Sequence, residues 1–556
     1  MKKLMISFLL SIIFSTNSSA QYTKYVVKFR DKAGTPFSTN QPSAFLSKKS
    51  IDRRLKQNIL IDESDLPIVP RYIDSLRVIP NVSIVNSSKW LNQVCIETTE
   101  AAALAKINSL SFVIGSQPVK KLLHPSFITR NKFKTGEKDV QTPSGITDIN
   151  YGNSFAQIHI HEGEFLHNNG FKGEGMLMAI IDDGFYHYQT LPAFDSVRIN
   201  NQIIETYDFV KNSPNVNDED AHGMQCFSII AANIPGQFVG SSPKANFLLY
   251  RSEDVGSESP IEEQNWAAAA ERSDSAGVDV ISTSLGYTTF DNSAFNYTYA
   301  DMNGHTTMIA KAASIAAKKG IIVLVAAGNE GNQSWKFIST PADADSVLTV
   351  AAVNASGIVA GFSSYGPSFD QRIKPTVASV GVGTTISSAS GAVSSGNGTS
   401  FATPNLAGLV TCLWQAYPEF SSREIIEAVK KSSSIYNNPD IRIGYGIPNF
   451  RLAFEDLKEK RTLRNVITIL AGKNIKIFPN PATDQFSVVI NPQRSGNGNF
   501  YLYDAAGKLL FIKQTLLQAS QPQVILFAST HYLPKGIYIL KFHDGVKNES
   551  FKIVIN

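Results

Sequence analysis

The stretch Met176-Leu-Met-Ala-Ile-Ile-Asp182-Asp183-Gly184 decides how the middle of this chain folds. It begins with an unbroken apolar run and ends abruptly in two acids and a glycine. A short apolar run without alternation, closed by turn residues, is typical of a strand that is buried on both faces of a parallel sheet. Polar residues at the carboxyl end of such a strand are candidates for function, because ligand sites of open α/β sheets form there.

The same pattern recurs between residues 151 and 456. Further short apolar runs end in turn residues: Asn246–Tyr250, Val278–Ser282, Ile321–Ala327 and Val347–Val353. Alanine-rich helical stretches, Trp266–Ala270 and Ile309–Lys318, lie between them. Buried strands that alternate with helices predict an α/β fold with a doubly wound parallel sheet.

The flanking segments have different patterns. Residues 21–121 mix strand-like alternation with helices expected at 50–57 and 100–109, and Thr98 or Thr99 is the expected cap of the second helix. This mixture predicts a small α+β domain. Residues 473–556 alternate with period two between Pro, Asn and Gly turns, which predicts a small all-β sandwich.

Two linkers and a leader complete the predicted domain organisation. Residues 122–150 are polar and lack apolar periodicity, which predicts a linker. A charged helix is expected at 454–463. Residues 457–472, which begin within this helix and lead to the C-terminal domain, are the second predicted linker. Residues 1–20 begin with two lysines, continue with an apolar run to Phe14 and end in Ser-Ser-Ala, the pattern of a cleaved signal peptide. Apolar runs elsewhere fall short of the ~18 residues that span a bilayer, so no transmembrane segment is expected.

Composition excludes several classes of protein. The 556 residues are 43% hydrophobic and 18% charged, which fits folded globular domains and not a disordered chain. The charge balance of 51 basic and 47 acidic residues gives +4, and no basic stripe is present, so no nucleic-acid partner is expected. The cysteines, Cys95, Cys226 and Cys412, fit no metal or redox spacing and are expected to be buried; whether Cys226 and Cys412 pair stays open.

Three separate segments carry residue types suited to nucleophilic catalysis. Asp182 ends an apolar strand, His222 precedes the apolar helical run 226–232, and Ser400 lies in Gly398-Thr-Ser-Phe-Ala-Thr-Pro404 at the start of a helix. A helix N-terminus favours developing negative charge, and Pro404 is acceptable if it falls in the first turn. Each residue alone has an ordinary structural explanation, but the order Asp, His, Ser is one of the known orders of a catalytic triad.

The segment from Gly173 to Gly446 resembles the subtilisin-like serine proteases. The resemblance rests on these motifs in the family's order: Ile181-Asp-x-Gly184, His222-Gly223, Ser284-Leu-Gly286, Ala326-Ala-Gly-Asn-Glu-Gly331, Phe362-Ser-Ser-Tyr-Gly-Pro367 and Gly398-Thr-Ser-Phe-Ala-Thr-Pro404. It implies a secreted serine endopeptidase that hydrolyses protein or peptide substrates through an acyl-enzyme.

The resemblance also implies a role for each site residue. Ser400 is the nucleophile, His222 the general base and Asp182 the residue that orients it. The side-chain amide of Asn329 and the backbone N–H of Ser400 form the oxyanion hole. Two extended segments flank the pocket for the substrate side chain that precedes the scissile bond, and they pair with the substrate backbone. The first segment contains Ser284, Leu285 and Gly286, and the second contains Ala327 and Gly328.

The sequence departs from the family pattern at several positions. Met224, Asn405 and Thr376 replace residues that are common in the family, and none of them is a triad member. Asp183 beside Asp182 is also unusual. If this stretch is extended, the two side chains point to opposite faces and repel each other little.

Alternative interpretations use other features of the same region. A metal site at His159, His161, Glu162, Glu164 and His167 is one, but Phe165 stands where the zincin pattern needs its second histidine. The other is a catalytically inactive subtilisin fold kept as a surface-binding module, although all the triad and oxyanion residues are present. The chemistry requires no cofactor. Structural calcium fits the family, but no contiguous acidic loop identifies a site.

The flanking domains resemble known accessory modules. Residues 21–121 resemble the family's propeptides, which implies an intramolecular inhibitor and self-cleavage within 122–150. Residues 473–556 resemble sorting domains of the type IX secretion system, which implies contact with secretion machinery and a product that is secreted or held at the outer cell surface. This second resemblance rests on Ile477-Phe-Pro-Asn-Pro-Ala482, Leu502-Tyr-Asp-x-x-Gly-Lys508, Gly536-Ile-Tyr538 and Lys552-Ile-Val-Ile-Asn556.

Overall fold

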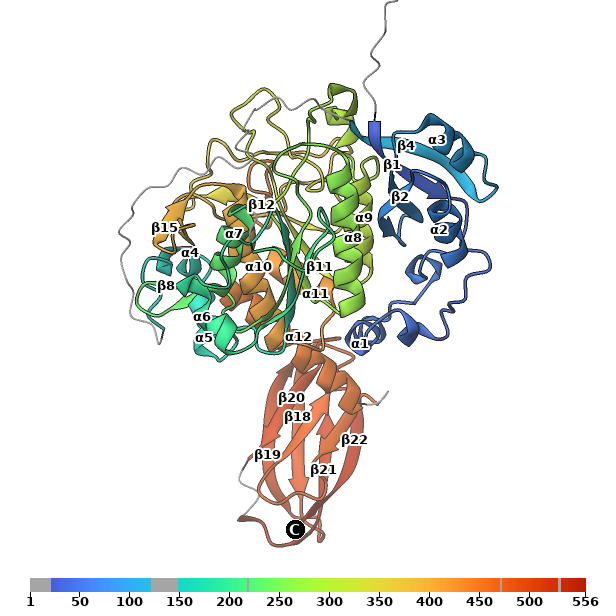
Figure 1. Cartoon of the computed structure of the whole chain (residues 1–556). Helices are drawn as coiled ribbons and strands as arrows, with labels where there is room; N and C mark the ends of the chain where they lie inside the picture. Colours follow the sequence, from blue (N-terminus) through green and yellow to red (C-terminus); the bar gives the residue numbers. More distant parts are fainter. Residues whose placement is uncertain (1–21, 122–148, 218–219, 471–472, 529–531) are drawn as a thin grey trace, which may run out of the picture. The chain divides into compact units, whose positions relative to one another are not determined.

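The computed structural model describes residues 22–121, 149–217, 220–470, 473–528 and 532–556 (Figure 1). The predicted signal peptide and all but the last two residues of the predicted linker 122–150 lie outside the described residues. The chain divides into two compact units, Met1–Ala453 and Phe454–Asn556, and each is described by itself.

A seven-stranded parallel sheet forms the centre of the first unit, in the order β13-β12-β11-β10-β5-β9-β6. The strands are β5 (Leu177–Asp182), β6 (Ile203–Asp208), β9 (Asn246–Arg251), β10 (Val280–Thr283), β11 (Ile322–Ala326), β12 (Leu348–Val353) and β13 (Val377–Val380). The strand order reverses between β5 and β10, where ligands of doubly wound sheets bind. The predicted fold class is therefore confirmed.

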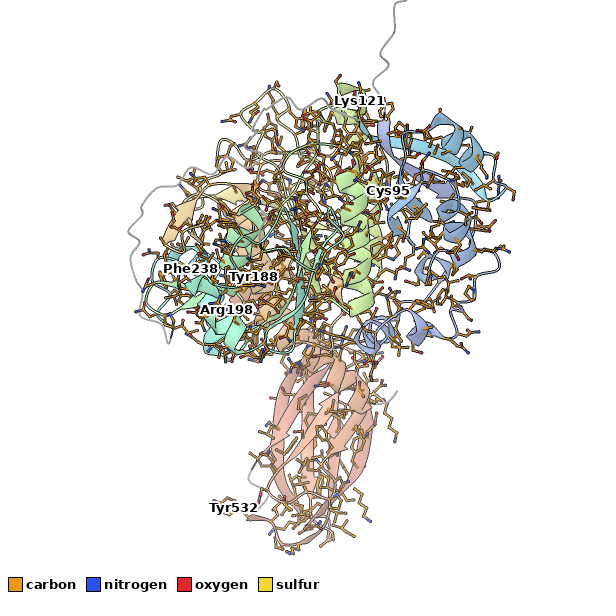
Figure 2. All side chains as sticks on the ribbon, in the orientation of Figure 1. Cys95, Lys121, Tyr188, Arg198, Phe238 and Tyr532 are labelled. Atoms are coloured by element: carbon orange, nitrogen blue, oxygen red, sulfur yellow. The ribbon has the colours of Figure 1, made fainter. Side chains whose placement is uncertain are left out.

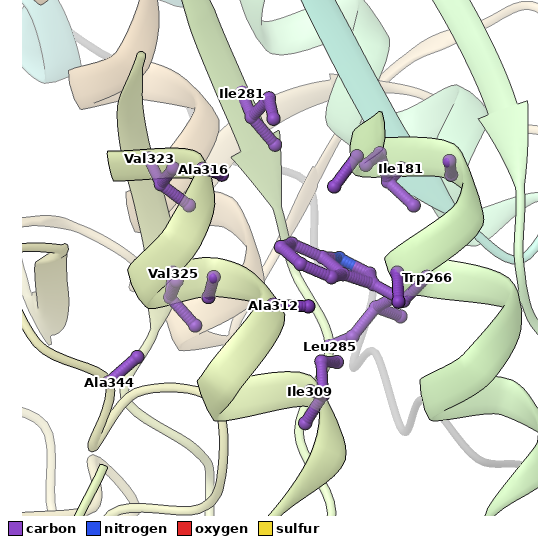
Figure 3. Close-up of a cluster of buried hydrophobic side chains, with 14 of the residues drawn as sticks. Ile181, Trp266, Ile281, Leu285, Ile309, Ala312, Ala316, Val323, Val325 and Ala344 are labelled. Carbon is purple, nitrogen blue, oxygen red and sulfur yellow. The ribbon is translucent and has the colours of Figure 1, made fainter. Parts of the chain in front are cut away.

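Helices cover both faces of this sheet. On one face lie α8 (Ile261–Ala276) and α9 (Met308–Lys318), and Figure 3 shows Trp266 of α8 packed beside Ile181 and Ile281. The Trp266 indole donates to the hydroxyl of Thr283 at 3.0 Å, so this large side chain is buried without an unpaired N–H.

The helices α7 (His222–Ala231) and α10 (Thr399–Ala416) pack against each other and against the central strands. Both helices are buried along almost their whole length, which explains their apolar, small-residue sequences. The small antiparallel pair β14 (Thr384–Ser387) and β15 (Val393–Gly396) leads into α10. Remaining short elements of this unit are α4 (Phe155–His159), α5 (Gly163–Asn168), α6 (Asp195–Ile199), β7 (Asn233–Ile234), β8 (Phe238–Val239) and α11 (Ser422–Lys431).

The N-terminal α+β prediction is also confirmed. A four-stranded antiparallel sheet, β2-β3-β1-β4, consists of β1 (Tyr22–Phe29), β2 (Ser83–Ser88), β3 (Gln93–Glu97) and β4 (Val113–Lys121). Its helices are α1 (Lys48–Lys56), α2 (Pro70–Arg77) and α3 (Ala101–Asn108). The expected cap of α3 is wrong: Glu100 is the N-cap residue without a side-chain cap, because the Thr98 hydroxyl accepts instead from the Glu100 backbone at 3.2 Å.

One face of this N-terminal sheet packs against α8. Val26 and Cys95 form a buried cluster with Ile261 at the start of α8, and Cys95 is labelled in Figure 2. The carboxylate of Glu271, further along α8, accepts from the backbone N–H groups of Lys89 and Trp90 at 2.8 and 3.1 Å. The N-terminal domain and the central domain therefore share a buried, hydrogen-bonded interface.

A buried ionic cluster joins the same two domains at the other end of α8. Arg54 of α1 is fully buried and bonds Asp65 at 3.0 Å and Asp274 at 2.7 Å. Arg53 also pairs with Asp274 and donates to the Val278 carbonyl at 2.5 Å. The ammonium of Lys319 completes the cluster 2.8 Å from Asp65. Charges of both signs thus offset one another where water is excluded.

The second unit contains two antiparallel sheets, β16-β17-β20 and β19-β18-β21-β22, which confirms the predicted all-β domain. The strands are β16 (Ile475–Phe478), β17 (Phe486–Ile490), β18 (Gly496–Tyr503), β19 (Leu509–Leu517), β20 (Gln523–Phe527), β21 (Gly536–His543) and β22 (Asn548–Ile555). Inward-facing side chains such as Phe500 and Leu540 form one core. Strand β19 is an edge strand whose Ile512 and Leu516 are 55% and 65% exposed.

Helix α12 (Phe450–Leu470) spans the division between the units. It extends the charged helix expected at 454–463 in both directions, so the segment 457–472 expected as a linker is helical as far as Leu470. Arg451, Leu452 and Ala453 before the expected helix are good helix formers, and Val466 and Leu470 after it are buried against Val489, which explains the extension.

Candidate active site

The site begins with a carboxylate and an imidazole at the end of strand β5. Asp182 is the last residue of β5 and His222 the first of α7, and Asp182 Oδ1 lies 2.7 Å from His222 Nδ1. Both side chains are buried. Gly223 allows this approach, because a Cβ there would lie 2.4 Å from the Gly184 carbonyl oxygen and 2.7 Å from Asp182 Cβ.

The electrostatics of this pair favour a charged imidazole. Burial by itself lowers the pKa of His222, but the Asp182 charge and hydrogen bond outweigh burial and raise the pKa above its usual value. The Asp182 carboxylate thus holds Nδ1 protonated and leaves Nε2 as the basic nitrogen.

The expectation for Asp183 is wrong. Strand β5 ends at Asp182, so strand alternation does not extend to Asp183, and both carboxylates face the start of α7. Asp183 Oδ1 accepts from the backbone N–H of Gly223 at 2.8 Å. Burial, followed by the charge of Asp182, raises the pKa of Asp183 well above its usual value. The two acids therefore interact strongly instead of lying on opposite faces.

Ser400 lies at the N-terminal end of α10, as predicted, as the second residue of the helix. The thiol of Cys226 links it to His222, since Cys226 Sγ is 3.9 Å from His222 Nε2 and 3.4 Å from the Ser400 carbonyl oxygen. The fold thus brings Asp182, His222 and Ser400 from separate elements into one place.

The position of Pro404 corrects a second expectation. Pro404 is the sixth residue of α10 and lies beyond the first turn. It has no N–H to donate to the Ser400 carbonyl, the acceptor four residues earlier. The hydroxyl of Ser284 donates to that carbonyl instead, at 2.8 Å. The segment after β10 is thereby tied to the residue that carries the candidate nucleophile.

Asn329 lies next to Thr399, the residue that precedes Ser400 at the start of α10. Its Oδ1 accepts from the backbone N–H and the hydroxyl of Thr399 at 2.9 and 3.0 Å, which fixes the direction of its amide nitrogen. A Cβ placed on Gly398 would lie 2.7 Å from Ser400 Oγ and 3.8 Å from Asn329 Nδ2. The hydroxyl and the amide N–H therefore border the same small space.

The segments expected to bind substrate follow β10 and β11. Gly286 and Gly328 both approach the side chain of Ser339, whereas Leu285 is 3% exposed and belongs to the central core. The Ala327 backbone N–H donates to Val350 at 3.1 Å and continues the sheet.

No role next to the site was predicted for three residues that lie there: Cys226, Ser339 and Glu330. Cys226 follows His222 by four positions on α7, and this helical spacing could have indicated its contact with the imidazole. The thiols of Cys226 and Cys412 are free and buried, so they do not pair.

The alternative metal site does not assemble. His159 pairs with Glu164, the His161 ring bonds the Pro448 carbonyl and Ser379, and the His167 ring bonds Tyr151 and the Ser241 carbonyl. These histidines therefore serve separate structural roles.

A group of carboxylates, Glu253, Glu258 and Glu262, has ligand atoms within 4.8 Å of one another. Glu253 accepts from the hydroxyls of Ser252 and Tyr287, and Glu262 accepts from the Asp254 backbone. The protein's own donors therefore occupy Glu253 Oε1 and Glu262 Oε1, which leaves these two oxygens less available to a calcium ion.

Comparison with known proteins agrees with this architecture. Residues 173–446 match the model of the Subtilase family, 24–135 match that of the Peptidase S8 propeptide domain of Bacteroidota, and 476–556 match that of the Secretion system C-terminal sorting domain. Residues 173–446 are therefore a subtilase domain, and the chain combines this domain with a propeptide and a sorting domain.

Its curated relatives are proteases of modest similarity. The chain is 26% identical over 276 residues to the Thermostable alkaline protease of Halalkalibacterium halodurans, covering 50% of this chain and 66% of that protein. It is 27% identical over 316 residues to Serine protease AprX of Bacillus subtilis, covering 51% and 67%. The chain thus spans about two thirds of the length of these relatives.

Among solved structures, MycP1 from Mycobacterium smegmatis is similar at a TM-score of 0.43 and 20% identity, over 58% of this chain and 89% of that one.

Within the described residues, every helix is too short or too polar to cross a lipid bilayer.

Proposed function

We propose that this chain is the precursor of a secreted serine endopeptidase whose triad is Asp182, His222 and Ser400. The observation that carries the proposal is the 2.7 Å contact between Asp182 Oδ1 and His222 Nδ1, next to the helix end that holds Ser400. This arrangement leaves Nε2 of His222 to accept the proton of Ser400 as its hydroxyl attacks a peptide carbonyl.

The proposed reaction proceeds in two halves. Ser400 Oγ bonds the carbonyl carbon and its proton passes to His222, which then gives that proton to the leaving amine as the peptide bond breaks. Water next attacks the acyl-enzyme, gives its proton to His222 and releases the acid. Asp182 stabilises the imidazolium in both halves.

Two donors stabilise the oxyanion in this mechanism. The Asn329 amide is oriented by its bonds to Thr399, and the Ser400 N–H belongs to the first turn of α10, whose amides have no intrahelical acceptor. No cofactor takes part in these steps.

The propeptide is proposed to inhibit the site until it is cleaved. Lys120, next to the last described residue of β4, bonds Asp254 at 2.8 Å in the loop that follows β9. In the same loop, the Ser252 N–H donates to the carbonyl of Asp182 at 3.0 Å. The chain therefore leaves the N-terminal domain on the side of the sheet that carries the triad, which supports self-cleavage within 122–150.

The remaining predicted boundaries belong to the same proposal: a signal peptide at 1–20, a propeptide at 21–121, a peptidase domain at 151–456 and a sorting domain at 473–556. The sorting-domain match supports contact of that domain with secretion machinery and export to the medium or the outer cell surface.

Labelling with a fluorophosphonate tests the catalytic proposal, because this reagent traps only an activated serine. We expect labelling of the wild-type chain, loss of labelling in Ser400→Ala, and normal labelling in Ser390→Ala, an exposed serine outside the site. A wild-type chain that folds and processes but resists labelling would favour the inactive binding module.

Two further experiments test processing and export. Ser400→Ala is expected to accumulate at full precursor length while the wild type loses residues 21–121, and identical processing of both would contradict self-cleavage. Fusing residues 473–556 to a periplasmic reporter is expected to send the reporter outside a competent host, and a reporter that stays periplasmic would contradict sorting.

A further inference from the structure

A cavity of about 550 Å³ lies between the N-terminal domain and the central domain, within the first compact unit. The N-terminal domain lines it with residues of β1, β3 and β4, and the central domain with the segment after β10 and the start of α9. Figure 1 shows β1 and β4 beside α8 and α9. A molecule bound in this interdomain cavity therefore contacts both domains at once.

The walls of the interdomain cavity are largely apolar. Met308 packs against the buried cluster that contains Val119, and Leu91 and Phe295 pack against the central core. These contacts hold the walls in place, so the apolar surface that a ligand covers is already formed. Removing such surface from water favours the binding of an apolar group.

Two lysines border the same cavity. Lys28 follows Val26 by two positions on β1 and so lies on the strand face that packs against α8. Lys311 lies on α9, and its ammonium donates to the Thr306 carbonyl at 3.0 Å. Among the residues that the structure describes, neither lysine has an ion-pair partner.

The two positive charges act on each other. Partial burial, followed by the charge of Lys28, lowers the pKa of Lys311, and the charge of Glu263 opposes this effect. The Glu263 oxygens, however, accept from the Tyr297 hydroxyl at 2.5 Å and from the Ile309 backbone N–H at 2.9 Å. Within the described chain the two lysines therefore lack a counter-ion, and an anion in the cavity supplies one.

We propose that the interdomain cavity binds a small amphipathic monoanion, such as a medium-chain carboxylate. Its anionic group lies between the ammonium groups of Lys28 and Lys311, and its apolar part lies against Leu91, Phe295 and Met308. The consequence for the precursor rests on the proposed function. Because the ligand needs both domains in place, it stabilises their association and delays release of the N-terminal domain after cleavage within 122–150.

Calorimetric titration of the full Ser400→Ala chain with octanoate tests the binding. We expect one molecule to bind per chain, and octan-1-ol, which has the same tail without the charge, to bind at least about tenfold more weakly, because hydrogen bonds to charged groups are the stronger ones. Absence of saturable octanoate binding would overturn the proposal, and equal affinities for the two compounds would contradict the role of the lysines.

Methionine variants locate the site. The double variant Lys28→Met, Lys311→Met keeps most of each aliphatic stem, so it should weaken octanoate at least about tenfold and leave the affinity for octan-1-ol nearly unchanged. Retained octan-1-ol binding also shows that the cavity is still formed. Lys318→Met is the matched control, because Lys318 is exposed on the same helix and does not line the cavity. Unchanged octanoate affinity in the double variant would place the ligand elsewhere and refute the assignment.

The effect on domain release needs a cut that does not depend on this chain's own activity. A recognition sequence for a site-specific protease, inserted between residues 122 and 148 of the Ser400→Ala chain, provides it. Saturating octanoate is expected to slow dissociation of the cut N-terminal domain about tenfold or more in gel filtration, and to have no such effect in the double lysine variant. Equal dissociation with and without octanoate would refute the coupling.

Failure of the proposed function has a different signature. The binding and release measurements use a chain without the candidate nucleophile, so they do not depend on catalysis. A wild-type chain that resists fluorophosphonate while octanoate binds would contradict only the protease proposal. A wild-type chain that is labelled while octanoate fails to bind would contradict only this inference.

Discussion

The carboxylate of Asp183 accepts a hydrogen bond from the backbone N–H of Gly223, 2.8 Å away. This bond places a second buried acid at the start of the helix that carries His222, next to the acid that binds the imidazole. Burial lowers the pKa of His222, and the charge of Asp183 is one of the contributions, after Asp182, that raise it. The pair Asp182–Asp183 therefore connects the stability of the helix start to the titration of the candidate base.

Replacing Asp183 with asparagine should shift the pH dependence of catalysis. The amide oxygen of the new side chain still accepts from the Gly223 N–H, but the negative charge that Asp183 carries above its raised pKa is removed. His222 must be neutral to accept a proton, and activity is lost as pH falls through its raised pKa. Asp183→Asn should therefore lower that pKa and move the acid limb of kcat/KM to lower pH, as measured with a peptide substrate from about pH 5 to 9, the range in which histidine titrates.

The control for this shift is Asp440→Asn, because Asp440 is exposed and lies in the distant segment that follows α11. A displacement of the acid limb to higher pH in Asp183→Asn would show that Asp183 acts on His222 in another way.

Asn329→Asp should test the oxyanion donor without releasing Thr399. Aspartate keeps an oxygen that accepts from the Thr399 backbone and hydroxyl but loses the N–H that faces the space beside Ser400. We expect kcat to fall about 10²- to 10³-fold or more with a small change in KM, the size of loss known for this donor in subtilisin. Stopped assays at saturating substrate measure it, and a change confined to KM would assign Asn329 to substrate binding.

The donor that replaces the missing N–H of Pro404 is expected to contribute to stability. Ser284→Ala removes the hydroxyl that bonds the Ser400 carbonyl and should lower the free energy of unfolding by about 1 to 3 kcal/mol, because that carbonyl is buried. Urea unfolding of the Ser400→Ala chain, which cannot cleave itself under this mechanism, gives the value.

A double-mutant cycle identifies the cause of this loss. Pro404→Ala restores a backbone N–H four residues after Ser400, so Ser284→Ala should be less destabilising in that background. Equal effects in both backgrounds would show that the hydroxyl stabilises the fold through some other contact.

Arg54→Met should destabilise the precursor strongly. It leaves the carboxylates of Asp65 and Asp274 buried with fewer cations, and breaking a buried pair in this way costs about 3 to 5 kcal/mol. Guanidinium unfolding of the uncleaved Ser400→Ala chain measures the change. Lys48→Met is the matched control on the same helix, because the Lys48–Asp52 pair is solvent-exposed and should contribute about 0 to 1 kcal/mol. Similar losses in both variants would contradict a role for the buried cluster.

The apolar strands and the candidate site residues could be predicted from the sequence, because burial on both faces leaves a continuous apolar run and a functional residue is a polar residue at the end of an apolar element. Asp182 at the end of β5, and His222 and Ser400 at the starts of α7 and α10, are such residues. The pairing of Arg54 with Asp274 could not be predicted, since the partners lie 220 positions apart and consecutive arginines on a short helix usually face solvent. The orientation of Asp183 was predicted wrongly because it depends on where β5 ends, and strand ends are the least certain part of a pattern.

The exposed edge strand β19 has a practical consequence for anyone who handles the C-terminal unit. Its outer backbone groups and the apolar side chains of Ile512 and Leu516 form a template on which a second strand can assemble, so concentrated fragments should associate edge to edge. Lysine at either position should keep the fragment monomeric in sedimentation experiments without disturbing its core.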